Sequence, residues 1–268
     1  MNIFFDMHTH SDNSPDGNNS VMFMCETAIQ KNLNYLTITD HCEINAFYKD
    51  HYNFAVKHSF FDIKKAKSVF KGQLEVLNGI ELGQATQDIE IAEKVVNALP
   101  YDFVLASVHN VKDKADFAFM DYSVNDPEYY FNIYLDELME LINWGNFDVL
   151  AHFTYPLRYI VGIHNLKLDL QKFEQKILKI FDMLIKNDKG IEINTSGLRQ
   201  PYNALMPDLW CLKLYKQAGG EIITIGSDAH RAEHIGANID DGIKAAIDAG
   251  FAEVAVFENR KPTFFSII

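Results

Sequence analysis

The 268-residue sequence predicts an α/β fold in which parallel strands and helices form a barrel of the TIM kind. Short apolar runs alternate with longer segments of helical spacing, which indicates parallel strands joined by helices. The short runs are apolar at consecutive positions, as expected for strands buried on both faces. Most of them end in a polar side chain, and barrels carry their active sites at that end of the strands. An open doubly wound sheet is the alternative.

The predicted elements follow one another along the whole chain. The predicted strands are a run starting at residues 3–5 and residues 35–39, 74–82, 102–108, 148–151, 190–194 and 221–226. The predicted helices are residues 20–33, 60–70, 88–99, 127–144, 169–186, 207–217 and 240–249. Pro100 ends the third of these helices, and Pro127 suits the first turn of the fourth.

Two further segments complete this prediction. Residues 42–59 are expected to be a long connection, and residues 252–257 are a candidate eighth strand. No repeat, low-complexity tract or linker divides the chain, so residues 1–268 are predicted to be a single domain.

Composition excludes several classes of protein. Nearly half of the residues are apolar and 32 are Phe or Tyr, which excludes a disordered chain. The net charge of -13, without a dense Lys/Arg cluster, argues against binding to nucleic acid or to anionic membranes. No apolar run is long enough to span a membrane.

The remaining compositional features favour a cytoplasmic location. The three cysteines, Cys25, Cys42 and Cys211, are odd in number and far apart, which indicates reduced thiols. The N-terminal run has no basic region and is interrupted by Asp6, so no signal peptide is expected.

Two pairs of potential metal ligands, each with two-residue spacing, suggest a metal site. His8 and His10 follow the first apolar run, and residues two apart in an extended chain face the same side. Asp228 and His230 repeat this spacing after the last strand, and Asp16 lies in the turn that follows the first. The two pairs should face each other where a barrel closes.

Together the predicted strand ends form a ring of groups that bind metals or protons. They are His8, His10, Asp40, His41, Glu81, His109, His152, Asn194, Asp228 and His230. Burying so many titratable groups is costly unless cations compensate them. The six histidines of this list, together with Glu81, Asp228 and Asp16, make nine strong candidate ligands, which is too many for one ion and suits two or three. Glu81, in the middle of the ring, is the natural bridge between ions.

The motifs at these strand ends resemble those of the PHP (polymerase and histidinol phosphatase) family. They are His8-Thr9-His10, Thr39-Asp40-His41, Ile80-Glu81, Ser107-Val108-His109, Ala151-His152 and Ser227-Asp228-Ala229-His230. The resemblance implies a distorted (β/α)7 barrel with three divalent metal ions, for which Zn, Mn and Fe all remain open.

The resemblance also implies a ligand set. One ion would bind His8, His10, Glu81 and Asp228. A second would bind Glu81, His109 and His152, and a third would bind Asp16, His41 and His230. Some family members carry a histidine in place of Asp16, so the third site is more oxygen-rich here.

Within the family, the chain is most similar to the stand-alone histidinol-phosphate phosphatases. Its length, the turn Ser14-Pro15-Asp16-Gly17 and residues 192–199 carry this likeness. The implied reaction is hydrolysis of L-histidinol phosphate by a metal-bridging hydroxide, with Asp228 and His230 at the reacting centre.

Other residues are expected to hold the substrate, a small phosphate ester. Arg158 and Arg199 follow strand ends, and arginine binds phosphate bidentately, so both should grip the ester. Asn110, Asn194 and residues 117–122 are candidates for recognising the remainder, and a substrate amine would suit an acidic protein.

Three alternatives remain at this point. A PHP phosphoesterase acting on nucleotides or phosphotyrosine would use the same ring of ligands. Metal-dependent hydrolysis of an amide or lactone usually employs a lysine or carbamate bridge, and no predicted strand here ends in Lys. A non-catalytic, metal-stabilised module is the third. Oligomeric state is left open.

Overall fold

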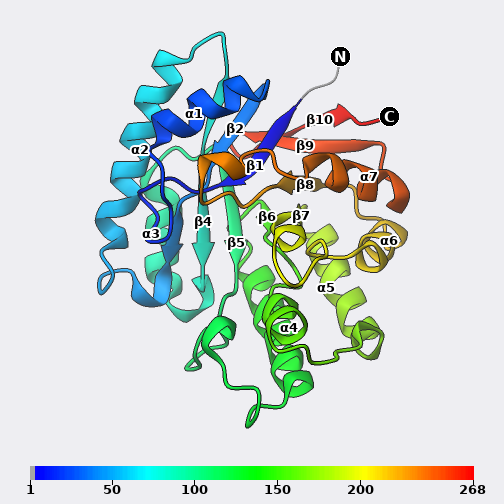
Figure 1. Cartoon of the computed structure of the whole chain (residues 1–268). Helices are drawn as coiled ribbons and strands as arrows, with labels where there is room; N and C mark the ends of the chain where they lie inside the picture. The colour runs from blue at the N-terminus through cyan, green and yellow to red at the C-terminus, as the bar shows by residue number, and fades with distance from the viewer. Residues whose placement is uncertain (1–3) are drawn as a thin grey trace.

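The computed structural model describes residues 4–268 and contains a parallel sheet that is nearly closed into a barrel (Figure 1). Its strands, in spatial order, are β1 (Phe5–Thr9), β2 (Tyr35–Ile38), β4 (Glu75–Gly83), β5 (Phe103–Ser107), β6 (Val149–Leu150), β7 (Gly190–Asn194) and β8 (Ile223–Gly226). Each strand pairs in parallel with the next. The predicted α/β barrel is therefore confirmed.

The barrel closes loosely between its first and last strands. The Asp228 N–H donates to the carbonyl of His8 at 2.8 Å, and the His10 N–H donates to the carbonyl of Ala229 at the same distance. These bonds lie just beyond β8, at the carboxyl ends of the strands. A short additional strand, β3 (His41–Glu43), pairs with β4 alone and distorts the ring.

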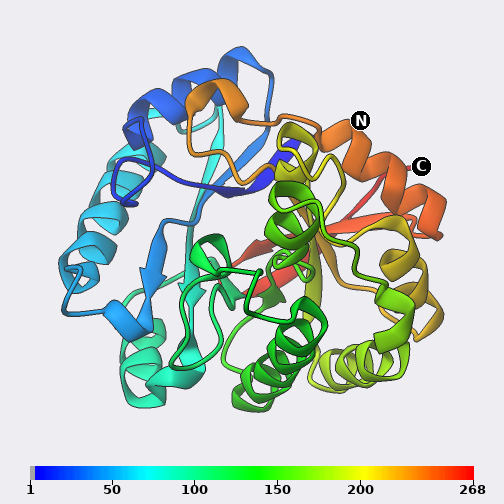
Figure 2. The ribbon, with the colours of Figure 1, turned by 60° about the horizontal axis from the view of Figure 1, so that its bottom comes forward.

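Helices surround the strands (Figure 2). They are α1 (Val21–Gln30), α2 (Tyr52–Val69), α3 (Ile89–Ala98), α4 (Pro127–Trp144), α5 (Glu174–Lys186), α6 (Leu209–Gln217) and α7 (Ile239–Ala249). Four begin at the residue types that cap helices best, since Ser20, Asp88, Asp126 and Asp208 each accept a backbone N–H of the first turn. Pro127 occupies the first turn of α4, as predicted.

Short helical turns lie mainly in the loops. They are η1 (Ile44–Ala46), η2 (Ala85–Gln87), η3 (Phe117–Phe119), η4 (Arg158–Ile163), η5 (Leu170–Phe173), η6 (Ser196–Arg199) and η7 (Ala232–His234). Several of them follow the strand ends directly and so form the rim of the site described below.

The long connection predicted for residues 42–59 is wrong. The chain forms β3 and η1 there, and α2 begins at Tyr52 rather than near residue 60. Only Tyr52, Ser59, Ile63 and Ala66 of this helix are buried. Because so few residues are buried, and one of them is a serine, the apolar residues in the first turns of α2 do not show the helical period in the sequence.

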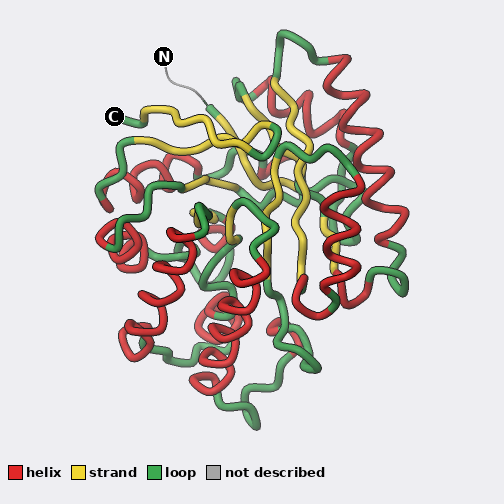
Figure 3. Tube along the Cα trace, turned by 180° about the vertical axis from the view of Figure 1, so that it is seen from behind, coloured by secondary structure: helices red, strands yellow, loops and turns green. Residues whose placement is uncertain are grey.

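The candidate eighth strand exists but lies outside the barrel. β9 (Glu253–Glu258) pairs antiparallel with β10 (Lys261–Ser266), next to the C-terminus at the upper left of Figure 3. Arg260, in the turn between them, donates from Nε to Asp148 at 2.6 Å, and its backbone N–H donates to the carbonyl of Asp102. The hairpin therefore covers the amino ends of β5 and β6, opposite the polar strand ends.

Within residues 4–268, no helix combines the length and the apolar character that a bilayer crossing requires.

Candidate active site

The carboxyl ends of the strands bring all nine predicted ligands into one cluster. β3 contains His41 and β4 contains Glu81. His109 lies two residues after β5, and His152 lies two residues after β6. The first and last strands supply two each, and the turn after β1 supplies Asp16. In this ring, segments more than 200 residues apart are neighbours because the barrel closes there.

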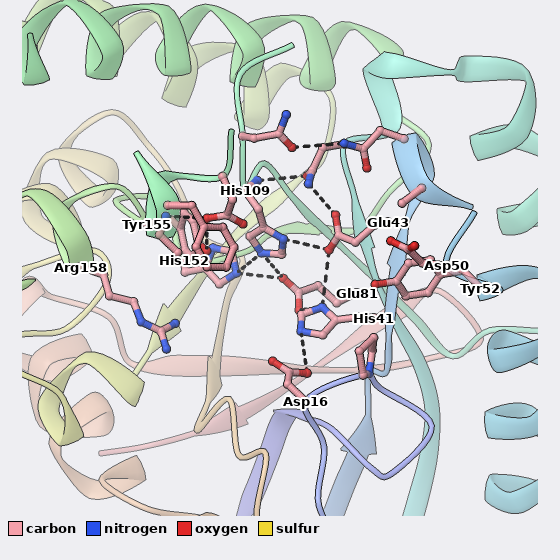
Figure 4. A pocket seen from close by; sticks show the side chains of 18 of the residues that line it. Asp16, His41, Glu43, Asp50, Tyr52, Glu81, His109, His152, Tyr155 and Arg158 are labelled. Atoms are coloured by element: carbon pink, nitrogen blue, oxygen red, sulfur yellow. Dashed lines mark hydrogen bonds and ion pairs between the residues drawn. The ribbon is translucent and has the colours of Figure 1, made fainter. Parts of the chain in front are cut away.

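Glu81 is the centre of the cluster (Figure 4). Its Oε1 lies 2.9 Å from His152 Nε2 and 3.1 Å from His109 Nε2. Its Oε2 lies 3.2 Å from His8 Nε2 and 3.0 Å from His41 Nδ1. The residue is 1% exposed. Because each oxygen faces a different set of imidazoles, Glu81 has the geometry of a bridging carboxylate.

The first group of ligand atoms lies on one side of Glu81. His8 Nε2 and His10 Nε2 are 2.9 Å apart, and Asp228 Oδ1 lies 3.7 Å from the former and 3.4 Å from the latter. Two ligands of a tetrahedral Zn²⁺ with bonds near 2.1 Å lie about 3.4 Å apart. These atoms therefore have the spacing of a coordination shell.

The second group shares the other oxygen of Glu81. His109 Nε2 and His152 Nε2 are 3.5 Å apart, and both lie within 3.1 Å of Glu81 Oε1. This group is buried and its three atoms fall within reach of a single ion.

The third group is more open. His230 Nε2 lies 3.0 Å from Asp16 Oδ2 and 3.4 Å from His41 Nε2, while His41 Nε2 lies 3.7 Å from Asp16 Oδ1. The Asp16 side chain is 60% exposed, in contrast to the buried ligands of the other groups. His10 also stacks on the rings of His41 and His230, at 4.2 Å in each case, which joins the third group to the first.

Hydrogen bonds behind the ligands fix the tautomers of His8 and His10. The Nδ1–H of His8 donates to Glu192 at 2.7 Å. The hydroxyl of Ser14 donates to Asp40, so its oxygen accepts from His10 Nδ1–H at 3.2 Å. When both rings are neutral, as in metal-bound histidines, the lone pairs of the two Nε2 atoms face each other 2.9 Å apart. They repel each other unless a metal ion or a proton lies between them, so the donor set fits a metal ion.

The same arrangement recurs at His109 and His230. His109 Nδ1–H donates to Glu43 at 2.9 Å, and His230 Nδ1–H donates to the backbone carbonyl of Asp228 at 3.1 Å. Their Nε2 lone pairs therefore also point at carboxylates and at other imidazoles. Such outer hydrogen bonds are typical of metal-binding histidines. The site thus fits divalent metal ions on its own chemistry.

The electrostatics of the cluster agree with this interpretation. Burial by itself would raise the pKa of Glu81, but His41, His8 and His109 hold that pKa well below its usual range. Burial would also raise the pKa of Asp228, but His8 and His10 hold that pKa well below its usual range. Burial lowers the pKa of His8, yet Glu192, Asp228 and Glu81 raise it well above its ordinary value. The carboxylates therefore create a negative potential that attracts cations.

Two supporting carboxylates were missed by the sequence analysis. Glu192 lies in β7, 1% exposed, and accepts from both His8 Nδ1 and the backbone N–H of His152. Glu43 follows His41 by two residues and accepts from His109. A charged residue inside the apolar run of β7 was the available signal for Glu192.

Replacing Glu192 with glutamine should weaken metal binding about 10- to 100-fold, the usual cost of losing a partner behind a metal ligand. The amide keeps the size of the side chain but no longer attracts the His8 Nδ1 proton as strongly. Titration of the metal-free protein with Zn²⁺ measures this. Glu221→Gln, at an exposed position just before β8, is the matched control, and equal affinities in the two variants would contradict the role.

Two strand-end residues of the predicted ring support the ligand groups from behind. Asp40 accepts from the hydroxyls of Ser11, Ser14 and Ser59 and so anchors the loop after β1. The amide of Asn194 donates to Glu192 at 3.2 Å and to the ligand residue Asp228 at 3.4 Å.

Seven of the nine ligands line a cavity of about 560 Å³, and the fully buried His8 and His10 lie behind them. Other residues lining it are Glu43, Asn45, Lys49, Asp50, Tyr52, Asn110, Lys114, Asp116, Phe119, Tyr155, Arg158 and Tyr159. Of the predicted recognition residues, Asn110, Ala118 and Phe119 are in the lining, whereas Phe117 is buried in the core and Asn194 is not among the lining residues.

The two arginines lie in different places. Arg158 lines the cavity, with Nη1 4.0 Å from Asp228 Oδ2, and points toward the ring in Figure 4. Arg199 donates to the backbone carbonyls of Ser227 and Ala237, and it is not among the residues that line the cavity. Its role in gripping phosphate stays a prediction.

Comparison with known proteins shows relatives that match nearly the whole chain. The chain is 29% identical over 251 residues to a "Probable histidinol-phosphatase" of Thermotoga maritima, covering 94% of each chain. It is 27% identical to the "Histidinol-phosphatase" of Lactococcus lactis subsp. lactis, covering 96% of this chain and 95% of that one.

A solved structure shows the same fold. It is the histidinol phosphate phosphatase from Lactococcus lactis subsp. lactis in complex with Zn, L-histidinol and phosphate, with a TM-score of 0.82 at 23% identity over 97% of this chain and 98% of that one. The family model of the PHP domain matches residues 6–196, which hold seven of the nine clustered ligands. The chain therefore belongs to the PHP domain family.

Proposed function

We propose that this protein is a metal-dependent phosphomonoesterase that hydrolyses L-histidinol phosphate to L-histidinol and phosphate. One observation carries the chemistry: three groups of imidazole and carboxylate atoms meet around Glu81, and seven of the nine ligand residues line a cavity that also contains Arg158. The relatives named histidinol-phosphatase support the substrate, because they match this chain over nearly its whole length.

Each group of ligands is proposed to hold one divalent ion. His8, His10, Glu81 and Asp228 would hold the first, with Glu81 shared. His109 and His152 would complete the second. The third would bind Asp16, His41 and His230. When bound, such ions lower the pKa of coordinated water toward neutrality and neutralise phosphoryl oxygens.

Arg158 is proposed to bind the phosphate of the substrate. Its guanidinium lies at the cavity wall and remains charged, because Tyr159 and Asp228 raise its pKa although burial lowers it. A planar guanidinium matches two phosphate oxygens at once. It would therefore orient the ester over the ligand ring, in a protein whose net charge of -13 otherwise repels anions.

Asp228 and His230 are proposed to act as ligands at the reacting centre rather than as proton donors. The low pKa of Asp228 keeps it a carboxylate. His230 has its Nδ1–H committed to a backbone carbonyl, and its Nε2 faces Asp16. The proton for the leaving alkoxide then comes from water in the cavity.

Arg158→Ala should raise KM for the phosphomonoester about 10- to 100-fold, the cost of one charge-assisted bidentate contact. Bound metal should be unchanged because no ligand is removed. Steady-state kinetics and metal analysis of the same sample test this. Unchanged KM would remove Arg158 from the substrate site.

Arg199→Ala separates two roles. If Arg199 also contacts the phosphate, KM rises while the melting temperature and metal content stay near those of the wild type. If it only supports the loop after β8 through the carbonyls of Ser227 and Ala237, the melting temperature falls and KM is unaffected.

Asp16→Ala should remove one metal equivalent per chain and lower turnover at least tenfold, because Asp16 is the only carboxylate of the proposed third group. Its side chain is largely exposed, so the fold should be unaffected. Elemental analysis and kinetics provide the measurement. Unchanged metal content and turnover would mean that the centre is dinuclear.

The activity itself is tested by metal analysis together with a phosphatase screen of the purified protein. The substrates are L-histidinol phosphate, phosphotyrosine and nucleotides. We expect phosphate release to be fastest from L-histidinol phosphate. Fewer than two metals per chain after loading, or no phosphate release from any substrate, would refute the proposal.

A further inference from the structure

A second, mostly apolar groove lies beside the active-site cavity. It has a volume of about 320 Å³, within the range of small-molecule sites. Its walls come from α2, α3 and the segment after η1, and α2 and α3 lie on the same side of the sheet in Figure 1. The apolar lining includes Phe47, Val56, Ile91, Val95 and Leu99.

One polar group in the groove has no partner. The hydroxyl of Tyr101 is buried and makes no hydrogen bond with any residue in the described range 4–268. The side chain is 6% exposed and belongs to the groove lining. Burial raises the pKa of Tyr101, so the hydroxyl stays protonated and is a donor. A buried hydroxyl without a partner lowers stability, and a ligand oxygen that reaches it once the surrounding groove side chains shift would offset this loss.

The charge of the groove is opposite to that of the whole protein. Acidic residues outnumber basic ones by 37 to 24 in the chain. The lining as described nevertheless contains Lys57 and Lys94 and no carboxylate. Lys94 already pairs with Glu90 at 2.6 Å. Lys57 is therefore the lysine of the lining that is left to pair with an anionic ligand. Both lysine side chains are exposed, at the edge of the apolar surface.

From these three observations we propose that the groove binds a small carboxylate with an apolar body. The body lies between α2 and α3, the carboxylate pairs with Lys57, and a ligand oxygen accepts the Tyr101 hydroxyl.

Binding in the groove should influence the active site. Phe47 and Tyr48 form part of the groove, and the flanking residues Ala46 and Lys49 line the active-site cavity. This segment directly follows β3, which carries His41. A ligand that fills the groove therefore fixes one wall of the cavity and should change KM. This second part rests on the proposed phosphatase activity, whereas binding itself does not.

Octanoate is a suitable probe, and octanamide is its uncharged counterpart. Isothermal titration calorimetry of the metal-loaded protein should show one saturable octanoate site per chain. Ala98→Trp, at an exposed groove position, should abolish binding of both probes. Lys57→Ala should weaken octanoate about fivefold and leave octanamide unchanged, since only the ion pair is lost. Lys213→Ala, on the exposed face of α6, is the control and should bind both like the wild type.

Tyr101→Phe distinguishes a ligand-binding hydroxyl from a structural one. We expect octanoate binding to weaken about fivefold and the melting temperature of the free protein to stay equal or rise. A lower melting temperature with unchanged octanoate affinity would overturn the assignment of Tyr101.

Two results would overturn the proposal as a whole. One is the absence of saturable octanoate binding to the wild type. The other is equal binding to Ala98→Trp, which would place octanoate elsewhere, such as on the metal ions. For the second part, saturating octanoate should change KM at least twofold in the wild type and not in Ala98→Trp. An unchanged KM in the wild type would refute the coupling.

Discussion

Glu81→Ala is expected to lower turnover by about three orders of magnitude or more and to reduce bound metal by at least one equivalent. Both oxygens of Glu81 face imidazole nitrogens of different groups, at 2.9 to 3.2 Å. Its loss removes one ligand from each of two proposed ions. Metal-ion stabilisation of a phosphoryl transition state amounts to several kcal/mol, and each 1.4 kcal/mol is about tenfold in rate.

Elemental analysis and single-substrate kinetics of the variant give the measurement. Two further variants serve as comparisons. Glu81→Gln keeps the volume and should lose nearly as much, because an amide cannot bridge two cations as a carboxylate does. Glu26→Ala, on an exposed position of α1, controls for loss of a negative charge. If Glu81→Ala retained wild-type metal content, Glu81 would not be a bridging ligand.

Complete removal of metal by a chelator is expected to abolish phosphatase activity and to lower the melting temperature by at least about 10 °C. A single ion present at about 1,000 times its dissociation constant stabilises the folded state by about 4 kcal/mol, and each further ion adds to this. For a domain of this size, 1 kcal/mol corresponds to about 2–4 °C. Without a metal ion, only a proton taken up by His8, whose pKa the neighbouring carboxylates raise, would separate the Nε2 atoms of His8 and His10, 2.9 Å apart.

Differential scanning calorimetry before and after chelation, and again after adding Zn²⁺ or Mn²⁺, provides the test. Activity and melting temperature should recover together as metal is restored. A chelated protein that keeps full activity would contradict metal-dependent catalysis. If activity were lost and the melting temperature did not move, the ions would be catalytic without supporting the fold.

The barrel could be predicted well from the sequence because parallel strands that are buried on both faces have apolar residues at consecutive positions, which is a local pattern. Residues 190–194 form β7 as predicted, and residues 127–144 form α4 with Pro127 in its first turn. The start of α2 could not be predicted in the same way, since only a few of its residues are buried. Residues 252–257 do form a strand, but nothing local indicates that it pairs with β10 instead of joining the barrel.

The candidate ligands were also visible in the sequence, since His-x-His spacing and polar residues at strand ends are local features. The residues that orient them were not. Glu192 hydrogen-bonds His8 across 184 positions of sequence, and Glu43 hydrogen-bonds His109 across 66. A carboxylate partner behind a histidine depends on strand order and register, which no local pattern specifies.

By itself, the sequence determined the class of fold, the identity of nine candidate ligands and the family that their motifs resemble. Only the tertiary structure decided which atoms of those ligands face one another, which imidazole nitrogens are free, that Arg158 lines the cavity and that Arg199 bonds to backbone carbonyls. The physical reason is that hydrophobic periodicity and residue type act over a few residues. Lone-pair direction, burial and electrostatic coupling depend instead on atoms that the barrel brings together from opposite ends of the chain.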